Sequence, residues 1–193
     1  MLLLPDILEM RYYMNTKSRR NILVLIILSI LLISSLGAKT PPQRLSPFWT
    51  LNLVGEEVTE TIFTPYRLTL VNIWATFCPP CLQEMPALAE LQKEFADKGV
   101  NVIGIVTDVY HTNQKIFNQN VTTANYILDQ TGAHYTHLLP SQDLQDLRLK
   151  DSQIVPETFF VDNTGTIVGQ TYYGARSKNA WKKIIESTLK LVD

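Results

Sequence analysis

The chain has 193 residues, which is enough for one domain and too short for two of full size. Its 46% hydrophobic and 18% charged residues exclude a disordered or collagen-like protein. The 17 basic and 18 acidic side chains give a net charge of -1. Basic residues do not outnumber acidic ones, so the chain lacks the positive charge that binds nucleic-acid phosphates. Nucleic acid is therefore not an expected partner. The sequence has two cysteines, Cys78 and Cys81, and any thiol chemistry rests on this pair.

An apolar run near the N-terminus indicates export or membrane attachment. Residues 22–36 contain no charge, whereas Lys17, Arg19 and Arg20 precede them. This polarity is typical of a segment whose N-terminal flank stays in the cytoplasm. The run has 15 residues, which is about 22 Å as a helix, against a hydrocarbon core of about 30 Å. The segment therefore fits either an uncleaved membrane anchor or a signal peptide cleaved after Gly37.

The sequence is expected to divide into three parts. Residues 1–37 form the export signal or anchor, residues 38–45 form a tether stiffened by two prolines, and residues 46–193 form one globular domain. The domain is expected on the extracytoplasmic side of the cell membrane, held by a single N-terminal pass, or secreted if the signal is cleaved. Met14 is an alternative start, because a compact export signal begins there.

The first half of the domain has the pattern of a hairpin followed by a βαβ unit. Aromatic and β-branched residues predict paired strands over 48–54 and 56–63. A nearly continuous apolar run over 68–76 predicts a strand covered on both faces. Apolar residues at three- and four-residue steps predict a helix over 81–98, and residues 100–106 predict a second buried strand. This order favours a right-handed crossover between parallel strands.

The second half of the domain mixes helices with a hairpin. Residues 112–132 are expected to form one or two helices inserted after the second buried strand. A short strand over 134–140 and a short helix over 142–150 follow. Residues 158–172 predict a hairpin, and residues 177–191 predict a helix capped by a serine. These elements together predict an α/β domain whose sheet has helices on its faces.

The two cysteines lie three residues apart, where the first buried strand gives way to the helix. This turn brings their sulfurs close enough for a small disulfide. Cys78 is expected at the helix N-terminus, where free N–H groups and the macrodipole lower a thiol pKa from about 8.5. Pro79 and Pro80 are tolerated there, because the N–H that proline lacks has no partner in a first helical turn. The pattern favours a redox-active pair Cys78 and Cys81.

Three other uses of the cysteines fit less well. A zinc site needs four ligands and would recruit His134 and His137, but zinc half-sites usually lie in polar knuckles. Covalent haem attachment needs a histidine directly after the second cysteine, and residue 82 is leucine. A structural disulfide that closes so short a loop would constrain little of the unfolded chain. No metal and no organic cofactor is therefore expected.

The segment around the cysteines resembles the active-site signature of the TlpA/ResA-like thioredoxins, exported relatives of thioredoxin. It reads VNIWATFCPPCLQEMPAL over residues 71–88. A second segment, residues 154–162, is similar to the cis-proline loop of that family and the strand after it. The resemblance covers residues 46–192. It implies a thioredoxin-like fold, with a central mixed β-sheet flanked by helices, an N-terminal β-hairpin and a helical insertion.

The resemblance also implies roles for single residues. Cys78 matches the exposed nucleophile and Cys81 the resolving cysteine of a redox-active disulfide. Pro156 matches the cis-proline that faces the disulfide, and Val155 the residue whose backbone pairs with an incoming substrate. Glu84 matches an acidic residue near the redox pair, which could carry the proton that Cys81 loses. From spacing alone, a solvated glutamate on the helix face is an equal alternative.

The sequence departs from thioredoxin at two positions near the cysteines. Asn72, which cannot titrate, stands where thioredoxin has a buried aspartate, and Glu84 becomes the better candidate for the proton carrier. Phe77 stands where thioredoxin has a tryptophan, directly before the first cysteine. The surface that Phe77 forms with Pro79 and Pro80 therefore stays apolar but lacks the indole N–H. Other aromatic residues are expected in the core or at the rim, without a chemical role: Trp74, Tyr172, Tyr173 and Trp181.

The resemblance implies an extracytoplasmic thiol-disulfide oxidoreductase that works as a reductase. Its implied substrates are disulfide-containing exported proteins, among them apocytochromes c awaiting haem and methionine sulfoxide reductases. Its implied reductant is a membrane-embedded thiol transporter, since no thioredoxin pool exists outside the cytoplasm. The opposite, oxidising direction stays open, because the potentials of such sites run from about -270 to -120 mV.

Two other classes of protein are alternatives. A peroxiredoxin-type thiol peroxidase shares the fold, but its P-x-x-x-T-x-x-C pattern needs a threonine three residues before Cys78. Ala75 stands there, and Thr76 is one residue too late. A non-catalytic module would hold zinc or copper through the cysteines and histidines. Peroxide turnover and metal content distinguish these alternatives from the disulfide reductase.

Overall fold

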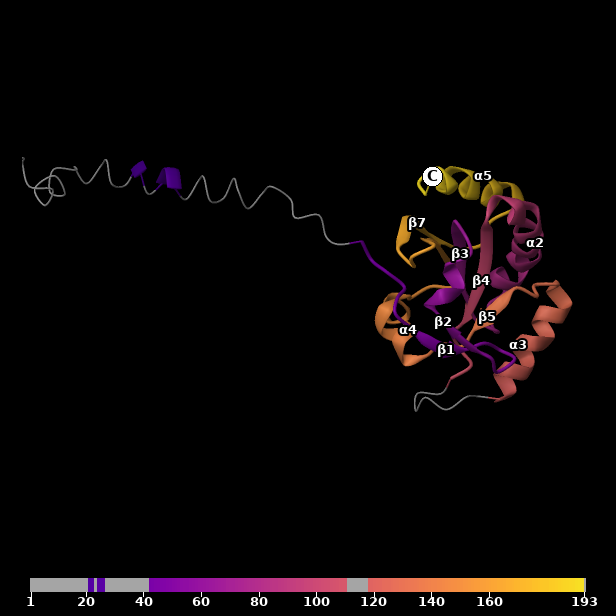
Figure 1. Ribbon diagram of the computed structural model, residues 1–193. Helices are drawn as coiled ribbons and strands as arrows, with labels where there is room; N and C mark the ends of the chain where they lie inside the picture. The colour runs from indigo at the N-terminus through magenta and orange to yellow at the C-terminus, as the bar shows by residue number, and fades with distance from the viewer. Residues whose placement is uncertain (1–20, 23, 27–41, 111–117, 193) are drawn as a thin grey trace, which may run out of the picture. The chain divides into compact units, whose positions relative to one another are not determined.

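The structure, a computed structural model, describes residues 21–22, 24–26, 42–110 and 118–192 (Figure 1). The chain divides into two units, Met1–Pro41 and Pro42–Asp193, and the second contains the sheet and its helices. Most of the predicted N-terminal apolar run lies outside the described residues. In the part of the chain that is described, no helix combines the length and the apolar character needed to cross a membrane.

A five-stranded sheet forms the centre of the second unit. Its strands lie in the order β5 (Thr136–Leu138), β4 (Val100–Val106), β3 (Leu68–Trp74), β6 (Glu157–Asp162) and β7 (Ile167–Tyr173). β3, β4 and β5 run parallel, whereas β6 and β7 are antiparallel to their neighbours. The mixed sheet that the resemblance implies is therefore confirmed, and so is the parallel pair of the predicted βαβ unit.

Three helices cover one face of this sheet: α2 (Pro79–Phe95), α3 (Asn118–Thr131) and α5 (Lys178–Leu189). β3 and β4 are buried along their whole length, which accounts for their mostly apolar sequences. The helices and strands share one hydrophobic cluster, in which each large apolar side chain contributes about 1.5–3 kcal/mol of burial energy. α2 and α5 pack side by side (Figure 1).

The opposite face of the sheet carries a second, smaller hydrophobic cluster. α4 (Gln142–Leu147) covers part of it, and so do the segments on either side of a hairpin formed by β1 (Trp49–Leu51) and β2 (Glu57–Thr59). The hairpin is confirmed, but its second strand is shorter than predicted. The chain leaves that strand early because Glu60–Phe63 forms a 3-10 helix capped by Thr59.

The other predicted elements are present with small shifts of their ends. α2 begins at Pro79, two residues earlier than predicted, because the two prolines occupy its first positions. A 3-10 turn continues it to Gly99, whose φ of 73° lies in the left-handed region that glycine favours. α3 confirms the later part of the predicted insertion, whereas residues 111–117 lie outside the described residues. Ser177 caps α5, as predicted.

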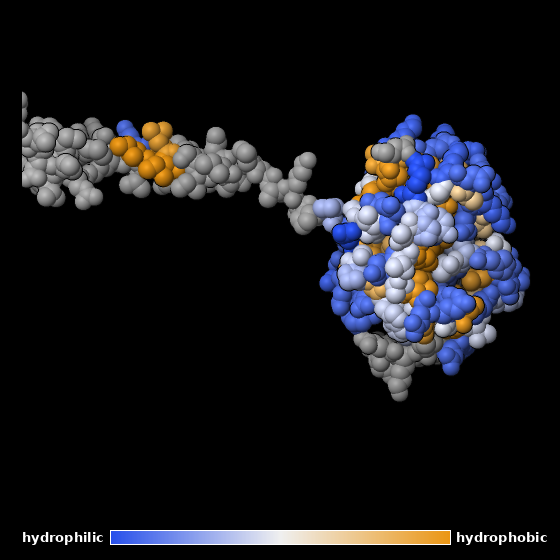
Figure 2. All heavy atoms as spheres, viewed as in Figure 1, coloured by the Kyte–Doolittle hydropathy of each residue, from blue (hydrophilic) through white to orange (hydrophobic). Residues whose placement is uncertain are grey.

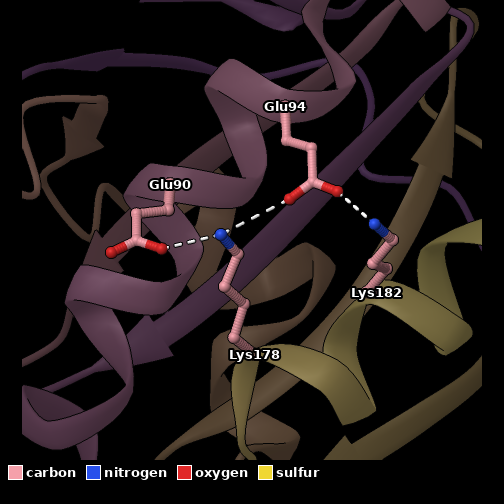
Figure 3. A network of polar contacts seen from close by, with 4 residues as sticks. All are labelled: Glu90, Glu94, Lys178 and Lys182. Carbon is pink, nitrogen blue, oxygen red and sulfur yellow. Dashed lines mark hydrogen bonds and ion pairs between the residues drawn. The ribbon is translucent and has the colours of Figure 1, made fainter.

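Ion pairs link α2 and α5 on their outer surface (Figure 3). Lys178 Nζ lies 2.7 Å from Glu90 and 3.4 Å from Glu94, and Lys182 also pairs with Glu94. Hydrogen bonding to Lys182 lowers the pKa of Glu94. Such solvent-facing pairs contribute little to stability, so the apolar contacts beneath them hold the two helices together. Hydrophilic side chains dominate the face of this unit seen in Figure 2.

Gly104 in β4 is required by the close approach of His137 from β5. A Cβ at position 104 would lie 2.1 Å from His137 Nδ1. The imidazole is fixed, because its Nδ1 accepts a hydrogen bond from the Trp74 indole and its Nε2 donates to the Ala133 carbonyl, both at 3.0 Å. We expect Gly104→Ala to lower the free energy of unfolding in urea by about 2 kcal/mol, as overpacking of a core does.

The double variant Gly104→Ala/His137→Ala serves as the control for this contact. It should lose less stability than the two single variants added together, because removing the imidazole makes room for the new methyl group. A Gly104→Ala protein as stable as the wild type would show that the imidazole does not constrain position 104.

Candidate active site

Cys78 and Cys81 form a disulfide at the N-terminus of α2. Cys78 is the N-cap residue, and its Sγ accepts a hydrogen bond from the Cys81 N–H at 3.2 Å. A helix-end N–H that points at this sulfur favours negative charge on it once the disulfide is reduced. Cys81 is fully buried, whereas 5% of Cys78 is exposed, so a molecule that approaches from solvent meets Cys78 first.

The exposed residues that flank Cys78 in the sequence are apolar. Phe77 is 73% exposed directly before Cys78. Pro79 and Pro80 are exposed at the first two positions of α2 and leave the helix intact, as expected for its first turn. The structure thus places these three predicted contact residues next to Cys78, the more exposed of the two cysteines.

The loop before β6 approaches the same site. The peptide bond between Val155 and Pro156 is cis, the isomer that the resemblance implies. Antiparallel pairing of β6 with β3 brings this loop to the carboxyl end of β3, from which the chain leads to Cys78. Phe77 and Val155 line one cavity of about 340 Å³. The cis-proline loop and the surface around the disulfide therefore meet.

A carboxylate that the sequence did not indicate holds the segment before Cys78. Asp108, two residues beyond β4, accepts hydrogen bonds from the Thr76 N–H at 3.1 Å and from the Thr76 hydroxyl. Asn120 on α3 donates to the Asp108 carbonyl at 2.6 Å. The signal that could have found Asp108 is its place after a buried parallel strand, since the carboxyl ends of such strands share one edge of the sheet.

Glu84 lies on α2 one turn after Cys81 and is 2% exposed. The alternative of a solvated glutamate on the helix face is therefore wrong. Its carboxylate accepts hydrogen bonds from the Asn72 amide at 2.9 Å and from the Arg176 N–H and the Trp181 indole at 3.0 Å each. The structure thus places a buried titratable group on the same side of the helix as the buried cysteine.

Burial raises the pKa of Glu84 above its ordinary value, because the charged carboxylate loses its hydration. The hydrogen bonds from Trp181, Arg176 and Asn72 favour the charged form and oppose this effect without cancelling it. The carboxyl group therefore keeps its proton to a higher pH than an exposed glutamate does. A pKa closer to the working pH is what efficient proton transfer requires.

Asn72 and Trp181 belong to this buried network. The Asn72 amide donates to Thr158 Oγ1 as well as to Glu84, both at 2.9 Å. Its Oδ1 is buried without a hydrogen-bond partner among the described residues. Trp181 is fully buried in the core, as expected, and its indole also donates a hydrogen bond to Glu84. The network joins α2, α5 and the start of β6.

The two histidines considered as metal ligands do not join the cysteines. His137 is buried with both ring nitrogens hydrogen-bonded inside the protein, and burial lowers its pKa to about 3. His134 lines another cavity of about 380 Å³, next to the hairpin turn and α3. Among the residues that the structure describes, no three His, Cys, Asp or Glu side chains are grouped so as to hold a metal ion.

The strand order, the helix that starts at a disulfide after β3 and the cis-proline before β6 define a thioredoxin-like protein, as predicted. A solved structure agrees: the thiol:disulfide interchange protein of the thioredoxin family from Chlorobium tepidum has a TM-score of 0.64 at 21% identity, covering 79% of this chain and 99% of that one. The chain belongs to the AhpC/TSA family, whose sequence profile matches residues 39–170.

Curated relatives match over shorter stretches. The thioredoxin-like protein YneN of Bacillus subtilis is 43% identical over 53 residues, which is 28% of this chain and 31% of that protein. The thiol-disulfide oxidoreductase ResA of Oceanobacillus iheyensis is 26% identical over 129 residues, which is 63% of this chain and 60% of that protein. The chain thus spans 31% of the first relative's length and 60% of the second's.

Proposed function

We propose that this chain is a thiol-disulfide oxidoreductase that acts outside the cytoplasm and reduces disulfides in exported proteins. The observation that carries the proposal is the Cys78–Cys81 disulfide at the N-terminus of α2, with Cys78 the more exposed cysteine and Glu84 buried one turn beyond Cys81. The similarity to ResA, a protein named as a thiol-disulfide oxidoreductase, supports the same class.

The first step is an attack by the Cys78 thiolate on one sulfur of the substrate disulfide. The substrate S–S bond breaks, its other sulfur leaves as a thiolate, and a mixed disulfide with Cys78 forms. The N–H of Cys81, which points at Cys78 Sγ, stabilises the attacking thiolate.

The substrate chain is proposed to lie across the apolar surface formed by Phe77, Pro79 and Pro80, opposite the loop of Val155 and Pro156. The backbone N–H and C=O of Val155 have no hydrogen-bond partner within the described residues, so they are available to an extended segment. Pairing of this kind would hold the substrate disulfide in line with Cys78.

The second step releases the product. Cys81 gives its proton to Glu84 and attacks Cys78, the mixed disulfide breaks, and the substrate sulfur leaves as a thiolate that takes up a proton. The protein ends with the Cys78–Cys81 disulfide, and the substrate has gained two electrons. A thiol donor then restores the dithiol form, and no metal or organic cofactor takes part.

The N-terminal sequence and the resemblance support a proposed location and proposed partners. Residues 1–37 are proposed to export the chain or anchor it in the membrane, and residues 38–45 to tether the domain of residues 46–193 on the outer side. Its electrons would then come from a membrane-embedded thiol transporter. Its substrates would be oxidised exported proteins, such as apocytochromes c or methionine sulfoxide reductases.

The proposal is tested by turnover of insulin disulfides with dithiothreitol as the electron donor. We expect a rate proportional to protein concentration, and no turnover of hydrogen peroxide above background with the same donor. Turnover of peroxide alone would contradict the proposal and favour a thiol peroxidase. An inert disulfide together with stoichiometric zinc in the reduced protein would favour a metal-binding module.

A second measurement tests the direction of electron flow. Equilibrating the protein with glutathione mixtures gives the potential of the Cys78–Cys81 pair. A reductase is expected near the thioredoxin value of about -270 mV, whereas a value near -120 mV would identify an oxidant.

A further inference from the structure

An ion pair lies buried next to the cis-proline loop. Arg148 is 7% exposed and Glu157 is fully buried, and Arg148 Nη2 binds Glu157 Oε1. The guanidinium lies over the Phe159 ring, 5.1 Å from its centre, and Nη2 is 3.4 Å from Thr171 Oγ1. Because Arg148 directly follows α4, the pair connects that helix to the start of β6 and to β7.

Stability alone is a poor explanation for this pair. Taking two charges out of water carries a large desolvation penalty, and well-packed apolar residues at such positions are often as stabilising or more so. The partners here are also incompletely satisfied. Glu157 Oε2, Arg148 Nε and Ser152 Oγ are all buried without a hydrogen bond to any described residue. An ion pair of this kind is better explained by the geometry that it fixes.

The ion pair fixes the geometry of the loop that lies between Arg148 and Glu157. Backbone hydrogen bonds hold this loop at its ends: the Ser152 N–H donates to Leu149 at 3.0 Å, and the Pro156 carbonyl accepts from Gly174 at 2.9 Å. Between these points, residues 153–155 make no backbone hydrogen bond with the rest of the described chain. The conformation of residues 153–155 therefore depends on how the two ends of the loop are held. The buried ion pair links these two ends.

We propose that Arg148 and Glu157 are positioning residues that hold the span 153–155 in the conformation that receives a polypeptide substrate. This inference rests on the proposed function. A polypeptide must align its backbone with the span before its disulfide meets Cys78, so its binding depends on the span being fixed in advance. A small disulfide has only to reach Cys78. The preferred substrate class is therefore a disulfide within an extended polypeptide segment.

The test replaces both charges by methionine, in Arg148→Met/Glu157→Met, because an apolar pair is expected to keep the fold. We expect the KM for an unstructured peptide that contains one disulfide to rise about tenfold, with kcat changed by less than about twofold. The rate with oxidised glutathione should fall by less than about twofold, since no backbone alignment is involved. Circular dichroism and urea unfolding check the fold.

Two further variants sharpen the test. Glu94→Met/Lys182→Met removes an exposed ion pair by the same substitutions and should leave the peptide KM unchanged. Arg148→Lys keeps the charge but loses the planar guanidinium, so we expect the peptide KM to rise in a folded protein. If the methionine double variant does not fold, Arg148→Lys tests the proposal through the same two measurements, the KM for the peptide and the rate with oxidised glutathione.

The outcomes separate this proposal from the function on which it rests. Equal losses with the peptide and with glutathione disulfide, or an unchanged peptide KM in a folded variant, would overturn the role of Arg148 and Glu157 alone. A wild-type protein that reduces neither disulfide would overturn the proposed function, and this role with it.

Discussion

Replacing Cys78 by serine is expected to slow disulfide reduction by about 1,000-fold or more, because a hydroxyl group is not ionised near neutral pH and cannot replace the thiolate. Replacing Cys81 by alanine has a different expected result. Cys78 still captures the substrate, but no second sulfur displaces it, so a mixed disulfide accumulates to one equivalent. Mass spectrometry of the acid-quenched reaction measures both outcomes.

Comparing the two variants shows which cysteine captures the substrate and which one releases it. Both variants lose turnover, and only Cys81→Ala is expected to retain substrate, because Cys81 is fully buried and Cys78 is partly exposed. A Cys78→Ala protein that traps substrate through Cys81 would reverse the assignment. Comparing Cys81→Ala with Cys81→Ser shows whether the result depends on the replacement residue.

Replacing Glu84 by glutamine is expected to slow the release of product on the order of 100-fold, the usual contribution of a positioned proton carrier. The glutamine oxygen can still accept the hydrogen bonds of Trp181 and Arg176, but the side chain cannot take up the proton of Cys81. The Asn72 amide can turn to offer its unpaired Oδ1 to the new amide group. Rapid-quench measurement of the mixed disulfide separates release from capture.

The matched control is Glu90→Gln, which makes the same change on the exposed side of the same helix and should leave release unaffected. Slower capture with normal release in Glu84→Gln would contradict the proposed role, since Glu84 is proposed to act on Cys81 and not on Cys78.

Glu84 also predicts how stability depends on pH. Because burial raises its pKa, the folded chain binds this proton more tightly than the unfolded chain does. Its contribution to stability is fully present below the ordinary glutamate pKa of about 4.3 and is lost as the pH rises through the raised value. Relative to Glu84→Gln, the wild type should therefore lose stability with rising pH across this interval. Urea unfolding at a series of pH values measures the difference in the free energy of unfolding between the two proteins. A difference that does not change with pH would contradict the raised pKa of Glu84.

Much of the fold could be predicted from hydrophobic patterning. β3 and β4 are mostly apolar because both of their faces are covered, and their bounds agree with the prediction to within two residues. The prediction of the second hairpin strand was too long, because local capping by Thr59 turned residues 60–63 into a 3-10 helix. Capping of this kind acts over one turn and leaves little trace in a periodic pattern.

The polar contacts around the site could not be predicted in the same way. Glu84 and Trp181 are 97 residues apart, and Asn72 and Thr158 are 86 apart. A periodic pattern indicates which side of an element is buried, but not which polar groups meet across the core. The sequence therefore left the environment of Glu84 open. The place of Asp108 after a buried strand could have suggested a position near the site, but not its contact with Thr76.

The most direct test of the central claim is a single half-reaction between the dithiol form of the protein and one equivalent of a protein disulfide. The mixture is quenched in acid, and the masses of both proteins are measured by mass spectrometry. We predict one Cys78–Cys81 disulfide formed for each substrate disulfide opened, with two hydrogen atoms lost by the protein and gained by the substrate. A fully folded protein that keeps both thiols, beside a substrate that stays oxidised, would contradict the account.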